Sequence, residues 1–181
     1  MRWDATRRSE TPPGLISAYA LSLFALGILA LAWDGLAAML RPDPAFPGSP
    51  GGRVGLAAMA LLPGCLVLAA MIAVQMALRW RTRAFDPLAG ADGPGLRLTQ
   101  RVISNTVEQL ALFAPALLAL GARVRPGAMP GIVAAGIVWA IARLMFWAGY
   151  ARSPVLRAPG MAATFAIGCA TLLAACWVWV V

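Results

Sequence analysis

Charged residues are scarce in this chain, and two residue types are missing altogether. Only 12% of its 181 residues are charged and 61% are hydrophobic, whereas about a quarter of the residues of an ordinary soluble domain are charged. There is no histidine, which excludes histidine-activated nucleophiles, histidine-ligated metals and a histidine proton switch. There is also no lysine, so all 15 basic residues are arginine. The composition predicts an integral membrane protein.

Few cysteines are present, and their spacing does not indicate a metal site. Cys65, Cys169 and Cys176 lie inside apolar runs without CxxC spacing, so we expect small buried residues. The net charge of +8 would suit nucleic acid in a soluble protein, but the arginines lie mostly in short segments between long apolar runs. This pattern is typical of loops that flank membrane spans, so no nucleic-acid partner is predicted. The arginine-only basic complement, with abundant Ala, Gly and Pro, indicates a GC-rich coding sequence and a bacterial origin.

Five apolar stretches are long enough to cross about 30 Å of hydrocarbon as helices. The first, 15–33, exceeds a signal-peptide core and lacks a small-x-small cleavage site, so we predict an uncleaved helix. The others are predicted at 54–78, 98–120, 131–150 and 160–181, with loops at 41–53, 79–97 and 152–159. Pro63-Gly64 predicts a kink in the second span and Pro115 a bend in the third.

The arginines are distributed unequally between the two sides of the membrane. One side would hold Arg2, Arg7, Arg8, Arg79, Arg81, Arg83, Arg97, Arg152 and Arg157, and the other Arg41, Arg53, Arg123 and Arg125. The positive-inside rule therefore predicts a multi-pass protein of the bacterial inner membrane, with the N-terminus and the second and fourth loops in the cytoplasm.

A polar stripe interrupts the third span. At about 100° per residue, Asn105 lies roughly 40° from Arg101 and Glu108 lies about 20° on its other side, so one helix face carries a cation, an amide and a carboxylate. In the fourth span Arg143 shares a face with Phe146 and Tyr150. Ionisable groups at membrane depth are costly unless they are paired or hydrated.

Two interpretations of these polar faces are open. In one, Arg143 pairs with Glu108, Asn105 forms a hydrogen bond across helices, and the cluster only fixes helix packing and oligomer register. In the other, the polar faces form a ligand site. Spacing alone does not decide between them.

Three motifs occur in order and on the same side of the membrane. They are Arg101-x-x-x-Asn105-x-x-Glu108, then Arg143-x-x-Phe146-x-x-x-Tyr150, then Ala-Arg152-Ser-Pro-Val-Leu-Arg157-Ala-Pro. Together they resemble the MAPEG family, the membrane-associated proteins in eicosanoid and glutathione metabolism. The resemblance covers about 54–181 and implies an all-α, four-helix membrane bundle. Residues 1–53 would add a tail, an extra transmembrane helix and a Pro/Gly-rich loop.

The resemblance also implies a homotrimer that binds glutathione as co-substrate between neighbouring subunits. Glutathione-binding roles fall on Arg101, Asn105, Glu108, Arg143 and Tyr150, and the catalytic role of stabilising the thiolate falls on Arg157. Arginine forks suit the carboxylates of glutathione, and a carboxylate suits its amine. A guanidinium lowers the pKa of the thiol. A lipophilic substrate would reach this thiolate from membrane lipid, without a metal.

The chain departs from the family pattern in two places. Phe146 stands where members that use glutathione often carry tyrosine, and the extra N-terminal helix has no counterpart in the family. Since the family also contains a lipid-binding member without catalytic activity, a non-catalytic lipid-binding or scaffold protein is an alternative function. A transporter or channel subunit is less favoured, because there is no inverted repeat and only one dense polar cluster.

Overall fold

The computed structural model describes residues 15–40, 48–86 and 92–181, and the regular elements within these ranges are all helical. They are α1 (Leu15–Met39), α2 (Pro50–Ala60), α3 (Leu62–Thr82), α4 (Pro94–Arg123), the 3-10 helix η2 (Pro126–Ala128), α5 (Met129–Tyr150) and α6 (Pro154–Val180). Five segments of this part of the chain are long and apolar enough to span a membrane, and α2 and α3 together form one of them. The predicted all-α fold with five spans is therefore confirmed.

Proline residues mark where most of these helices begin. Helices α2, α4 and α6 each start with a proline, which costs no hydrogen bond because the first four N–H groups of a helix have no intrahelical acceptor. The Ser153 hydroxyl caps α6 by accepting a hydrogen bond from the Leu156 amide at 3.2 Å. The predicted loop at 152–159 is therefore too long: Arg152 and Ser153 lie outside the helices, but Arg157 lies in the first turn of α6.

The kink predicted at Pro63-Gly64 is a one-residue break at Leu61, between α2 and α3. Pro63 has no N–H group and cannot donate to the carbonyl of the preceding turn. Gly64 is buried, and a Cβ atom there would come within 2.9 Å of the Trp139 ring. The break leaves both half-helices in contact with α4 and α5.

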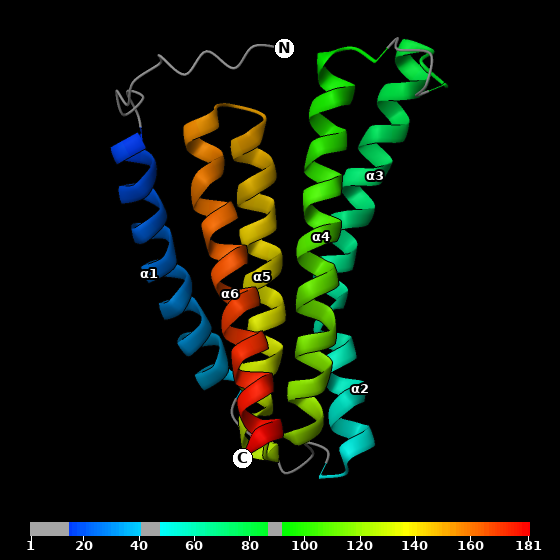
Figure 1. Ribbon diagram of the computed structural model, residues 1–181. Coiled ribbons are helices and arrows are strands. Elements are labelled where there is room, and N and C mark those ends of the chain that lie inside the picture. The colour runs from blue at the N-terminus through cyan, green and yellow to red at the C-terminus, as the bar shows by residue number, and fades with distance from the viewer. Residues whose placement is uncertain (1–14, 41–47, 87–91) are drawn as a thin grey trace.

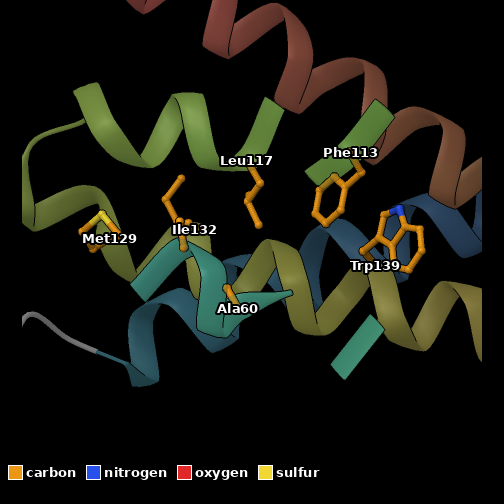
Figure 2. Close-up of a cluster of buried hydrophobic side chains, with 7 residues drawn as sticks. Ala60, Phe113, Leu117, Met129, Ile132 and Trp139 are labelled. Atoms are coloured by element: carbon orange, nitrogen blue, oxygen red, sulfur yellow. The ribbon is translucent and has the colours of Figure 1, made fainter. Parts of the chain in front are cut away.

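The main apolar core joins α2, α4 and α5 (Figure 2). Its buried members are Ala57, Ala60, Phe113, Leu117, Met129, Ile132 and Trp139. The Phe113 and Trp139 rings stack with their centroids 5.3 Å apart and an interplanar angle of 4°. A Cβ atom at Gly136 would overlap the Ala60 carbonyl, so only glycine permits this approach of α5 to α2. This core holds the three helices together in the half of the bundle that contains the α4–α5 junction (Figure 1).

The extra N-terminal helix, α1, packs against α5 and α6 (Figure 1). Leu29 contributes to a buried cluster with Val138 and Ala163, and the Trp33 indole N–H donates to the Gly131 carbonyl at 2.9 Å. The outer face of α1 exposes large apolar side chains such as Phe24. Such a surface suits lipid, as expected for a membrane-spanning helix.

The helix ends gather on two sides of the bundle (Figure 1). The start of α1, the end of α3 and the start of α4 lie at one end, together with the junction between α5 and α6. The junction between α4 and α5 lies at the other end, with the C-terminus. The two loops nearest the polar stripe therefore share one side, as predicted.

Candidate functional site

The side chain of Arg143 is the centre of the polar cluster and is completely buried. One terminal guanidinium nitrogen donates to the Asn105 side-chain oxygen on α4 at 2.9 Å. The other donates to the Thr164 hydroxyl on α6 at 3.0 Å. Thr164 donates in turn to the Gly160 carbonyl at 3.0 Å. One cation on α5 therefore connects three helices.

Aromatic rings supply the rest of the Arg143 environment. Its guanidinium carbon lies 4.1 Å from the centroid of Phe146 and 5.9 Å from that of Trp139, within the range of cation–π attraction. Its Nε atom is buried without a hydrogen-bond partner in the part of the chain that the structure describes. The buried charge thus has neutral oxygens and ring faces as neighbours, instead of a carboxylate.

The ring contacts continue from Arg143 towards the end of the bundle. Phe146 and Tyr150 meet edge to face, with centroids 5.4 Å apart. The guanidinium carbon of Arg157 lies 4.9 Å from the centroid of Tyr150. We call the series Asn105, Arg143, Phe146, Tyr150 and Arg157 the polar–aromatic row. The row links α4, α5 and the first turn of α6.

A close approach of α5 to α6 holds this row together. A Cβ atom at Gly149 would overlap the carbonyl of Leu156, and one at Gly160 would overlap the backbone nitrogen of Phe146. Glycine at both positions lets the two backbones pack directly against each other. Arg157 consequently lies over Tyr150, although the two are seven residues apart and on different helices.

Two predicted site residues lie outside the row. Arg101 and Glu108 are exposed, and neither side chain makes a hydrogen bond or ion pair with any residue in the described ranges. The hypothesis that Arg143 pairs with Glu108 is wrong, because the two terminal nitrogens of Arg143 bond Asn105 and Thr164. The predicted hydrogen bond of Asn105 across helices is confirmed.

Sequence reasoning missed two neighbours of Arg143. Thr164 lies seven residues after Arg157, which places both on nearly the same face of α6, so helical spacing could have identified it. Trp139 lies four residues before Arg143 on α5, and its size and apolar surroundings made it resemble ordinary core. Neither residue belongs to the motifs that guided the prediction.

The remaining polar and sulfur groups do not form a second site. The Gln75 side-chain amide donates to the Gln100 side-chain oxygen on α4 at 3.4 Å, a contact between helices. No group of three or more metal-ligating side chains is found in the residues that the structure describes. The prediction of buried cysteines is wrong for Cys65 and Cys176, which are exposed, while Cys169 is half-buried. All three lie on helices that are long and apolar enough to span a membrane.

Comparison with known proteins gives one match. The sequence model of the MAPEG family matches residues 55–178, more than half of the chain. No match was found among curated proteins or among solved structures.

Proposed function

Because this chain belongs to the MAPEG family of membrane proteins, we propose that it is a membrane glutathione transferase or peroxidase. The observation that carries the proposal is the polar–aromatic row, which runs from Arg157 to Asn105. Asn105 lies on the same face of α4 as Arg101 and Glu108. Cations, a phenol, an amide and a carboxylate are the groups that an anionic, zwitterionic thiol such as glutathione requires.

The exposed charges of α4 favour an interface between subunits, and the family resemblance makes a homotrimer the proposed assembly. Glu108 lies near the middle of α4, where a charge facing lipid costs on the order of 3 kcal/mol. In the proposed assembly a neighbouring subunit covers this face, and glutathione lies between the two subunits. Arg101 would then bind a carboxylate of glutathione, and Glu108 its amine.

The proposed roles of the other residues follow from their burial. Arg157 is exposed at the end of the row and would touch the thiolate, so it is the proposed catalytic residue. Tyr150, beneath it, would donate a hydrogen bond to glutathione. Arg143 is completely buried, so we assign it to building the site by orienting Asn105.

The proposed chemistry needs no metal. Arg157 favours the thiolate by lowering the pKa of the glutathione thiol. In the transferase reaction the sulfur bonds to an electrophilic carbon, and the leaving group departs with its electron pair. In the peroxidase reaction two glutathione molecules are oxidised to the disulfide, while a lipid hydroperoxide is reduced to an alcohol and water.

The proposed location is a bacterial inner membrane, with the row on the cytoplasmic side. The arginine distribution supports this orientation, since most loop arginines lie on the side of Arg157. Glutathione would enter from the cytoplasm, and a lipophilic electrophile would arrive through the bilayer.

A purified-protein assay tests the activity directly. The substrates are glutathione with chlorodinitrobenzene, and glutathione with a lipid hydroperoxide. Arg157→Ala should lower turnover by about a hundredfold, the scale of a lost electrostatic contact. Arg152→Ala is the matched control, because Arg152 is exposed nearby and its side chain donates to the Ala148 carbonyl and to no other group in the described ranges. Equal effects of the two substitutions would refute the role of Arg157.

A non-catalytic lipid-binding protein is the second candidate, and Phe146 favours it. Phe146 packs against Arg143 and Tyr150 and cannot donate the hydrogen bond that a tyrosine would offer. This candidate predicts that lipids raise the thermal unfolding midpoint and that glutathione does not, since only a ligand of the native state stabilises it.

A further inference from the structure

A cavity of about 600 Å³ lies between α1 and the rest of the bundle. Its walls come from α1, α4, α5 and α6, and they extend from Val138 and Ala163 to Val124 and Val178. The cavity therefore occupies the half of the bundle away from Tyr150 and Arg157. The family match begins at residue 55, so the wall formed by α1 is an addition to the family fold.

The lining of this cavity is apolar and has no free hydrogen-bonding side chain. Trp33 and Thr171 alone among the lining residues have polar side-chain atoms. The Trp33 N–H donates to the Gly131 carbonyl, and the Thr171 hydroxyl donates to the Ile167 carbonyl at 2.8 Å. A polar ligand or water would find no hydrogen-bonding partner in this cavity. A hydrocarbon chain needs none and would contact the apolar lining.

Two arginines flank the lining residue Val124 at the end of the cavity. Arg123 donates to the Val178 carbonyl at 3.3 Å, and its guanidinium carbon lies 5.0 Å from the centroid of Trp179. Arg125 is exposed, and its side chain makes no hydrogen bond or ion pair within the described part of the chain. This end of α4 is where a membrane-spanning helix reaches the head groups.

We propose that the cavity binds an acyl chain of an anionic membrane phospholipid, whose phosphate is bound by Arg123 and Arg125. Charge complementarity selects this occupant. The Arg123 guanidinium contacts the lining residue Val178, and Arg125 directly follows the lining residue Val124, so cationic residues adjoin an apolar cavity and match a phosphate joined to a hydrocarbon chain. The bound lipid would fill the space between α1 and the helices α5 and α6. The proposal is independent of thiol chemistry at the opposite end of the bundle.

Native mass spectrometry of the full chain in mild detergent tests this site. Phosphatidylglycerol and phosphatidylcholine with identical acyl chains are added at equal concentrations. We expect one phosphatidylglycerol per chain, retained about tenfold more strongly than phosphatidylcholine, the ratio expected for a charge-assisted contact. Arg125→Ala should bring the ratio of the two lipids close to one.

Cavity-filling variants test where the acyl chain lies. Ala166→Phe on α6 and Ala30→Phe on α1 both add a ring to the lining, and each should lower phosphatidylglycerol retention by about tenfold. Ala20→Phe is the control, because Ala20 is exposed on α1 and does not line the cavity. Circular dichroism checks that the two cavity-filling variants fold. If they do not, the lipid ratio of Arg125→Ala still tests the proposal, because this substitution adds nothing to the cavity. Equal retention of both lipids by the unmodified chain, or unchanged retention in folded filling variants, overturns the proposal.

Discussion

At the scale of single residues, Arg143 bears on whether the polar cluster serves helix packing alone or a ligand site. A buried arginine with two hydrogen bonds to neutral oxygens and an unpartnered Nε is a poor source of stability. A residue that fixed packing alone would be replaceable by an apolar side chain of similar length. The proposed function instead assigns Arg143 to orienting Asn105 in the site.

Arg143→Met distinguishes a role of Arg143 in helix packing from a role in glutathione binding. We expect the free energy of unfolding to change by less than about 1 kcal/mol, because replacing a buried charge by an apolar side chain is often neutral. Glutathione affinity should fall by about tenfold, equivalent to roughly 1.4 kcal/mol, because Asn105 loses the donor that orients it. Thermal unfolding and calorimetry measure the two effects. A large loss of stability with unchanged glutathione affinity would show that Arg143 acts in packing alone.

Residue types and helical spacing predicted part of the cluster. The participation of Asn105, Arg143 and Tyr150 follows from two polar faces that share one end of the bundle. The partner of Arg143 could not be derived from the sequence. Glu108 and Thr164 can both accept a hydrogen bond from a guanidinium, and the spacing within one helix does not show which face the next helix turns towards it.

At the scale of the elements, the contact between α5 and α6 positions the row. Gly160 lies against the backbone of Phe146, and Thr164, one turn later, bonds Arg143. The position of Arg157 over Tyr150 depends on the same contact. The packing of two glycines therefore determines the geometry of the polar–aromatic row as much as its charges do.

Gly160→Ala tests this dependence. The added methyl group would overlap the backbone of Phe146 and separate α5 from α6, so we expect a loss of about 1–3 kcal/mol in unfolding free energy. Gly168→Ala is the matched control on the same helix, because a Cβ atom there meets nothing within 4 Å. Thermal unfolding followed by tryptophan fluorescence compares them. Equal destabilisation by both substitutions would contradict this account of the α5–α6 contact.

Hydropathy predicted the number and order of the spans, but not all their boundaries. Residues 152–159 were predicted as a loop, whereas α6 begins at Pro154, because proline fits the first position of a helix. Pro159 lies inside α6. The partners of α1 could not be predicted either. Its hydrophobicity is nearly uniform around the helix, so no periodic signal marks the face that packs on α5 and α6.

At the scale of the whole molecule, the exposed charges of α4 favour the proposed site between subunits. Arg101 and Glu108 share a face with Asn105 but have no partner among the described residues of one chain. A neighbouring subunit would supply one, and it would also remove Glu108 from lipid. The cost of intramembrane charge therefore favours an interface between subunits at this face, as in the proposed trimer.

Ala111→Trp tests the proposed subunit contact. Ala111 is exposed on α4, one turn after Glu108, and a large ring there should obstruct the neighbour. We expect native mass spectrometry to find three chains per particle for the unmodified protein and mainly single chains for this variant. Ala20→Trp on the outer face of α1 should leave the trimer intact. A trimer that persists in Ala111→Trp would place the interface elsewhere.

Glutathione binding to the detergent-solubilised protein, measured by calorimetry, is the decisive measurement for the proposed function. We expect saturable binding at millimolar glutathione or below, weakened by about tenfold in Glu108→Gln because the glutathione amine loses its carboxylate partner. Absence of binding at millimolar glutathione, with lipid still bound, would contradict it and favour the non-catalytic lipid-binding protein.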